Sequence, residues 1–171
     1  MKKMNYSKLS LVFACCLLFS LVVRGSFVMA AEPSAPSVAE DVSSKDLGDL
    51  VTMAWAVSGE GNYARLDEIV SAILKQYEQE AMALHSGLSA FPARDKVEDY
   101  KVLNHVATAL FVRAESLMHQ GKTEEAVAAF NDLIKQYPYA QSWDPSRGAY
   151  WSIAEKSRAS VDQMTGVEGG E

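Results

Sequence analysis

The stretch that decides the fold is GKTEEAVAAFNDLIKQYPYA, residues 121–140. A glycine opens it and Tyr-Pro closes it. Between them, apolar residues recur three and four positions apart, which places them on one face of an α-helix. Because proline cannot continue a helix, Pro138 is expected to end this one. The stretch is therefore predicted to be a tight turn followed by the second helix of a helical hairpin.

The same pattern lies sixty residues earlier in the chain. Residues 54–77 read AWAVSGEGNYARLDEIVSAILKQY, and residues 114–137 read AESLMHQGKTEEAVAAFNDLIKQY. The two segments align without a gap, and their apolar positions coincide. The aligned pairs are Ala54 with Ala114, Val57 with Leu117, Gly61 with Gly121, Leu66 with Ala126, Val70 with Phe130, Ile73 with Leu133 and Leu74 with Ile134. An internal repeat of one helix end, a glycine turn and a second helix is therefore predicted.

Helical periodicity predicts five helices, over residues 44–58, 62–85, 96–120, 123–137 and 144–164. Ser43 with Asp46 gives a start signal for the first helix, and Gly87 can end the second in a left-handed cap. For the fifth, Asp144 suits the cap and Pro145 the first turn. Strand-like alternation is absent, so the body is expected to be all helical, with the fifth helix capping the fourth.

The second copy resembles the tetratricopeptide repeat, a helix-turn-helix unit of about 34 residues. Ala114, Gly121, Ala126, Phe130 and Pro138 fall in the register of that family. The resemblance implies that the two alanines allow the helices to cross closely, that Phe130 fills the space against the next helix, and that Pro138 stops the second helix. The segment is also similar to the tetratricopeptide units of bacterial envelope proteins that assist outer-membrane assembly.

The first copy departs from the family pattern. Ala54 and Tyr63 fit, but Leu66 replaces a small alanine and Glu78 stands where proline would, while residues 78–104 form a long insert. A short solenoid of stacked antiparallel hairpins is predicted, without a regular superhelix. The residues expected to pack the repeats are Ala54, Gly61, Leu66, Val70, Ala114, Gly121, Ala126, Phe130 and Pro138.

Residues 1–30 have the layout of a secretory signal. Three lysines precede an apolar run over residues 9–23, and small residues follow, with a cut expected after Ala30 or Ala31. Two alternatives stay open: an uncleaved anchor, although the run is short for a membrane span, and lipidation at Cys15. A flexible leader over residues 31–42, a helical domain over residues 43–164 and a disordered tail over residues 165–171 are expected to follow. The mature protein is thus expected in the periplasm or outside the cell.

The net charge and the residue types present argue against several classes of function. Cleavage would remove four basic residues and no acidic one, which changes the balance of 16 basic and 22 acidic residues to 12 and 22, a net charge of −10. An acidic surface disfavours nucleic acid and anionic membranes as partners, so membrane contact is expected only if the signal is retained or lipidated. Both cysteines lie in the signal, the three histidines lack metal-ligand spacing, and no phosphate loop or nucleophile elbow is present. No cofactor, metal or catalysis is expected.

Partner-binding candidates come from two places. The stretch YPYAQSWDPSRGAYW, residues 137–151, concentrates aromatic residues and one arginine, the types that dominate binding hot spots. It suggests Trp143 and Arg147, although the favoured interpretation of the stretch is structural, with Tyr150 and Trp151 in the core of the capping helix and Trp143 holding the loop. The family resemblance implies a ligand along the first helices of the hairpins. The candidates there, expected to be exposed, are Asn104, Thr108 and Arg113.

The sequence thus predicts a module that binds a protein or peptide, as a scaffold or assembly factor in the bacterial envelope. One alternative is a structural subunit of an outer-membrane assembly or secretion complex. Another is an enzyme with an unrecognised site, against which the lack of clustered catalytic residues counts.

Overall fold

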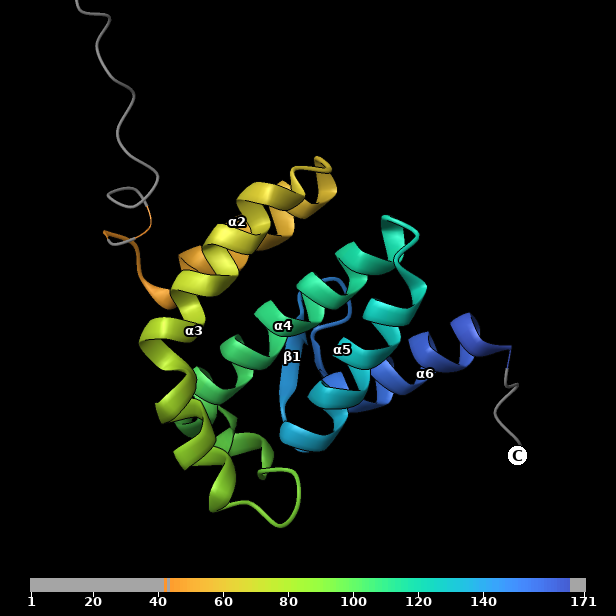
Figure 1. Cartoon of the computed structure of the whole chain (residues 1–171). Helices are drawn as coiled ribbons and strands as arrows, with labels where there is room; N and C mark the ends of the chain where they lie inside the picture. Colours follow the sequence, from red (N-terminus) through yellow and green to blue (C-terminus); the bar gives the residue numbers. More distant parts are fainter. Residues whose placement is uncertain (1–41, 43, 167–171) are drawn as a thin grey trace, which may run out of the picture. The chain divides into compact units, whose positions relative to one another are not determined.

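The computed structural model describes residue 42 and residues 44–166. The predicted signal, most of the leader and the end of the tail lie outside these residues. Figure 1 shows the order of the elements. They are α2 (Leu47–Gly59), α3 (Tyr63–Ser86), the 3₁₀ helix η1 (Arg94–Tyr100), α4 (Lys101–His119), α5 (Thr123–Gln136), β1 (Gln141–Asp144), β2 (Ala149–Ser152) and α6 (Ile153–Thr165). The predicted class, a mainly helical fold of stacked antiparallel hairpins, is confirmed.

The two hairpin turns have the same backbone geometry. Gly61 and Gly121 both have a φ of 73°, a left-handed conformation that glycine adopts without steric cost. The amide N–H of Gly61 donates to Ser58 at 3.0 Å, and that of Gly121 donates to Met118 at 3.0 Å. The next amide in each turn closes a second bond of 2.9 or 3.0 Å to the carbonyl five residues back. Both helices therefore end in a Schellman motif, and the sixty-residue repeat extends to individual hydrogen bonds.

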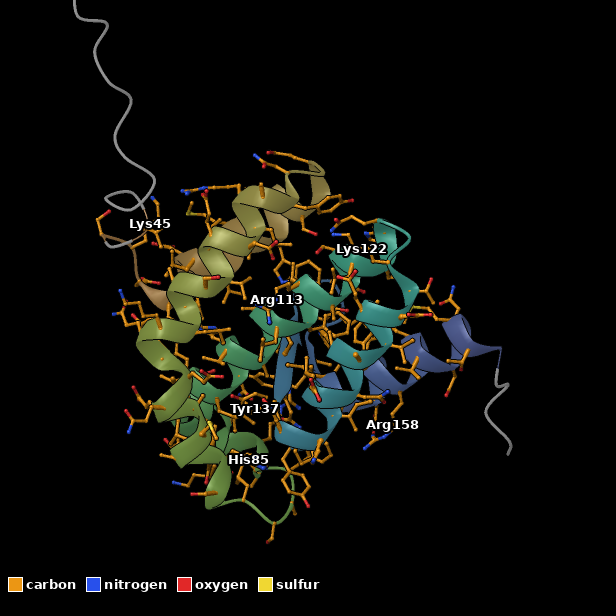
Figure 2. All side chains as sticks on the ribbon, in the orientation of Figure 1. Lys45, His85, Arg113, Lys122, Tyr137 and Arg158 are labelled. Carbon is orange, nitrogen blue, oxygen red and sulfur yellow. The ribbon has the colours of Figure 1, made fainter. Side chains whose placement is uncertain are left out.

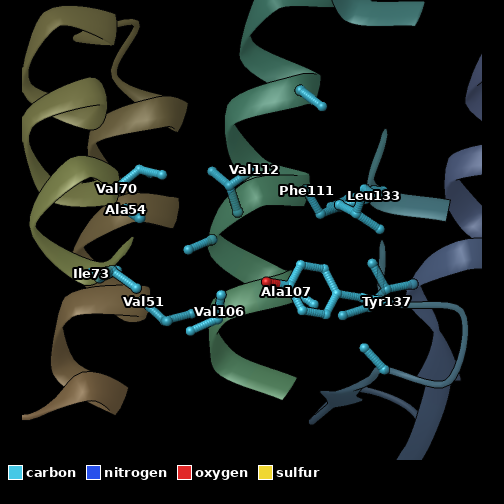
Figure 3. Close-up of a cluster of buried hydrophobic side chains, with 14 of the residues drawn as sticks. Val51, Ala54, Val70, Ile73, Val106, Ala107, Phe111, Val112, Leu133 and Tyr137 are labelled. Atoms are coloured by element: carbon cyan, nitrogen blue, oxygen red, sulfur yellow. The ribbon is translucent and has the colours of Figure 1, made fainter. Parts of the chain in front are cut away.

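Helix α4 is the centre of the packing. It contacts α2 and α3 on one side, α5 and α6 on the other, and it also contacts β1. Figure 3 shows side chains of α2, α3 and α4 meeting in one apolar layer, and α4 meeting the Leu133 and Tyr137 side chains in another. Ten residues of α4 are buried, more than in any other described helix. A helix that is buried on several faces needs partners on each, which the neighbouring helices supply.

Small residues and one large aromatic set the spacing within the repeats. Ala54, Ala114 and Ala126 are fully buried where helices approach one another, and so is Leu66, the bulkier residue of the first copy. Phe130 is fully buried, with its ring centroid 5.6 Å from that of Phe111 on α4. Burying a phenylalanine side chain contributes about 1.5–3 kcal/mol. The turn glycines are exposed, and Pro138 follows directly after the C-cap of α5.

Several predicted boundaries were wrong in detail. Asp46, not Ser43, caps α2, because its carboxylate accepts the Asp49 N–H at 2.9 Å and the helix begins at Leu47. Gly87 follows α3 with a φ of −83°, so the expected left-handed cap does not form there. Val42 is buried in the core although it was assigned to the flexible leader. Thr165 is the last residue of α6, not the start of a tail, and its hydroxyl donates to the Val161 carbonyl at 2.9 Å.

The largest error concerns residues 141–152, which form an antiparallel hairpin, whereas the sequence predicted a helix from residue 144 onward. Gln141 pairs with Ser152, and Asp144 pairs with Ala149. Asp144 closes the loop, since its side-chain Oδ1 accepts the backbone N–H of Ser146 at 2.9 Å. Its carbonyl accepts the N–H of Gly148 at 2.9 Å, and that glycine has a φ of 61°. Asp-Pro begins a turn here, so α6 starts only at Ile153.

The capping role expected for the last helix is nevertheless found. Helix α6 packs along α5, and Ser152 caps its N-terminus by accepting the Glu155 N–H at 3.2 Å. Tyr150 and Trp151, expected on that helix, lie in β2. Among the described helices, none is both long enough and apolar enough to cross a membrane.

Candidate functional site

A groove with a volume of about 540 Å³ lies between the first helices of the two hairpins and the β-hairpin. Gly48, Val51, Thr52 and Trp55 of α2 form one wall, and Lys101, Asn104, His105 and Thr108 of α4 form the floor. Residues 141–145, with Tyr150 and Trp151, form the other wall, and Val97 and Glu98 of η1 close one end. Helices α2 and α4 are equivalent in the repeat, so the groove follows from hairpin stacking, whereas its far wall is an addition to the repeat.

Four aromatic side chains line this groove, Trp55, Trp143, Tyr150 and Trp151, and the Phe111 ring lies behind two of them. Phe111, which is fully buried on α4, lies with its ring centroid 6.3 Å from that of Trp55 and 5.2 Å from that of Trp151. Trp143 and Tyr150 are paired across the β-hairpin, and their ring centroids are 5.0 Å apart. The Trp55 and Trp143 side chains are 41% and 47% exposed. Two large apolar side chains therefore stand open to solvent on opposite walls of one cavity.

Asn104 joins the floor of the groove to its far wall. It is only 8% exposed, and its carboxamide oxygen accepts the backbone N–H of Gln141 at 2.9 Å. Thr108, which is 3% exposed, donates its hydroxyl to the Asn104 carbonyl at 2.7 Å. A buried amide that loses its partner costs about 1–3 kcal/mol, so this bond fixes where β1 lies on α4.

Two acidic and two basic side chains line the groove, namely Glu98, Asp144, Lys101 and His105. Burial lowers the pKa of His105 below its ordinary value of 6.5, and the nearby Lys101 lowers it further. His105 is therefore mostly neutral at pH 7. Hydrogen bonds from Ser146 lower the pKa of the Asp144 carboxyl, which stays ionised. Glu98 accepts the Tyr150 hydroxyl at 2.8 Å, which raises the pKa of that phenol. Two carboxylates, one ammonium group and a mostly neutral imidazole thus line the groove.

The comparison with family models identifies the second hairpin. Residues 108–138 match the model of the tetratricopeptide repeat. The chain carries a tetratricopeptide repeat. The match runs from Thr108 on the groove floor through the Gly121 turn and α5 to Pro138. Thr108 is the one residue of the matched segment that lines the groove, whose other lining residues lie outside it. Searches of curated proteins and of solved structures gave no match.

The structure brings together three of the five predicted partner-binding residues. Asn104, Thr108 and Trp143 all line the groove beside the repeat. The expectation that Asn104 and Thr108 are exposed was wrong, because both are buried and their side chains hydrogen-bond within the protein. Arg113 is half-buried on α4, where Figure 2 labels it, and does not line the groove. Arg147 lies on the hairpin loop beside a separate cavity of about 530 Å³.

The sequence prediction did not include Trp55, His105 or Glu98. A signal for Trp55 was present, since it lies outside the apolar face of the first helix although it is large and apolar. No comparable signal exists for Glu98, which reaches the site through Tyr150, 52 residues later. The part of the chain that the structure describes contains no group of three or more His, Cys, Asp or Glu side chains placed to hold a metal ion.

Proposed function

We propose that this chain is an exported module that binds another protein, and that the groove between α2, α4 and the β-hairpin is its binding site. The observation that carries the proposal is the pair of exposed tryptophans, Trp55 and Trp143, on opposite walls of that groove. Exposed aromatic residues next to a cavity are typical hot spots of protein interfaces. Tetratricopeptide repeats are generally interaction modules without catalytic activity, which agrees with this assignment.

The biological setting is part of the proposal. The signal-like pattern of residues 1–30 supports export to the bacterial envelope, where the module would serve as a scaffold or assembly factor. Sequencing the N-terminus of the mature protein tests this directly. A first residue of Ala31 or Glu32 supports cleavage and release, whereas a chain that still begins at Met1, or one that begins at a blocked Cys15, refutes release of the mature protein.

Site-specific photocrosslinking tests the groove. A benzophenone amino acid is placed at Trp55, at Trp143 or, as the matched control, at Met82, which is 56% exposed on α3 and does not line the groove. We expect one defined protein adduct from positions 55 and 143 in the cells that make the protein, and none from position 82. Equal crosslinking from all three positions, or adducts from position 82 alone, would refute the groove as the binding site.

A further inference from the structure

The pattern of hydrogen-bonded and non-bonded residue pairs in the β-hairpin shows which main-chain groups of β1 point away from β2. The N–H of Ile153 donates to the carbonyl of Ala140 at 3.2 Å. Bonded and non-bonded pairs alternate along an antiparallel ladder, so Gln141 and Trp143 point their N–H and C=O groups away from β2. The bond from Gln141 N–H to Asn104 on α4 confirms this direction. The outer edge of β1 therefore presents the Trp143 N–H, the Trp143 C=O and the Gln141 C=O.

This edge borders the groove. Every residue of β1 lines the groove, as does Pro145, whereas β2 contributes only Tyr150 and Trp151. The other side of the hairpin borders the cavity formed with Glu155 and Lys156 of α6. Among the described residues, no hydrogen bond engages the main chain of Trp143 outside the β1–β2 pair. A strand edge with unpaired groups is a template on which an extended chain can add a strand.

The charges of the groove indicate what kind of chain fits. Glu98 and Asp144 line the groove together with Lys101 and a largely neutral His105, which gives two carboxylates against one ammonium group. The Asp144 carboxylate also pairs with the guanidinium group of Arg147 at 3.4 Å, but that side chain is 80% exposed and lines the other cavity instead of the groove. A negative balance inside an aromatic cavity favours a cationic side chain, through both carboxylate pairing and contact with tryptophan faces.

We propose that the partner enters as an extended segment bearing a lysine or arginine, and that it adds a third strand to the sheet on the outer edge of β1. This inference rests on the proposed function and states how the groove holds its partner. The Trp143 main chain supplies the hydrogen bonds, Trp55 and Trp143 enclose the segment, and Glu98 with Asp144 receives its basic side chain. Because main-chain bonds carry the pairing, partner sequences can vary at the other positions.

The test uses random twelve-residue peptides displayed on phage and selected against the full-length protein. The selected sequences are synthesised twice, once unmodified and once N-methylated at alternate residues, which leaves the side chains in place but removes the main-chain donors. Two variants form a matched pair. Trp143→Ala removes the ring and keeps the N–H, whereas Trp143→Pro removes both, and proline is tolerated on the edge of a sheet.

We expect the selected peptides to be enriched in lysine or arginine. They should bind Trp143→Pro on the order of tenfold more weakly than Trp143→Ala, since at least one main-chain bond is lost, and the N-methylated twins should not bind. In the unmodified protein, hydrogen exchange at the Trp143 N–H should slow when peptide is added, which tests the pairing even if the proline variant misfolds.

The failures of the two proposals are distinguishable. Equal binding to both Trp143 variants, with unaffected N-methylated twins and weaker binding to Trp55→Ala, would overturn the strand pairing and leave the groove as the site. Acidic consensus sequences would overturn the stated partner chemistry. Binding that neither Trp55→Ala nor Trp143→Ala weakens, or a selection that yields no peptide, would overturn both proposals.

Discussion

Replacing Gly61 or Gly121 by alanine should destabilise the protein by the same amount. Both glycines have a φ of 73°, and a Cβ built at either position meets no atom of a residue beyond its two chain neighbours within 4 Å. Steric crowding with neighbouring groups is therefore absent, and only the local backbone cost of a left-handed residue remains, about 1–2 kcal/mol. Because the two turns share their hydrogen bonds, the structure predicts two nearly equal losses of unfolding free energy.

Gly59 is the matched control for this experiment. It is the last residue of α2, it also has open space around its Cβ position, and its φ is not positive. Alanine is the better helix former, so Gly59→Ala should be neutral or should stabilise the protein by up to about 1 kcal/mol. A glycine-to-alanine substitution only two residues from Gly61 is thus expected to change the free energy of unfolding in the opposite direction or not at all.

Urea denaturation followed by circular dichroism at 222 nm measures all three variants. The slope of unfolding free energy against urea should stay constant, so that shifts of the midpoint report stability alone. The reasoning is refuted if Gly121→Ala is as stable as the parent protein, or if Gly59→Ala loses as much as Gly61→Ala. A large difference between the two turn variants would contradict the structural equivalence of the hairpins.

Three further outcomes follow from buried contacts. Phe130→Ala should cost about 3–5 kcal/mol of unfolding free energy, whereas Phe91→Ala, at a side chain 41% exposed, should cost much less in the same urea titration. Asn104→Leu should cost about 1–3 kcal/mol and speed amide hydrogen exchange at Gln141, whose acceptor is lost; unchanged exchange would disprove the anchoring role. The lowered pKa of His105 means that the unfolded chain takes up its proton first as pH falls, so stability should drop from pH 7.5 toward pH 5. The His105→Gln variant should show a shallower drop, and an identical pH profile would contradict burial of a neutral imidazole.

The sequence by itself determined the helical hairpins, because their signals are local. A glycine that must adopt positive φ, apolar residues at helical spacing and a proline after the last turn act within a few residues of one another. These signals located the turns at Gly61 and Gly121 and the end of α5 near Pro138. They also placed Asn104, Thr108 and Trp143 among the candidates, although the reason given for the first two was wrong.

Only the tertiary structure decided that residues 141–152 form a two-stranded hairpin and that a groove exists. The Asp-Pro signal serves helix starts and turns equally, so local pattern could not choose between them. A two-stranded hairpin is marginal on its own. Here it is held by α4, through the bond between Asn104 and Gln141, 37 residues apart, and through the contact of Trp151 with Phe111. Contacts between residues so far apart depend on how the helices stack, which is why the binding surface could not be read from the pattern that built the hairpins.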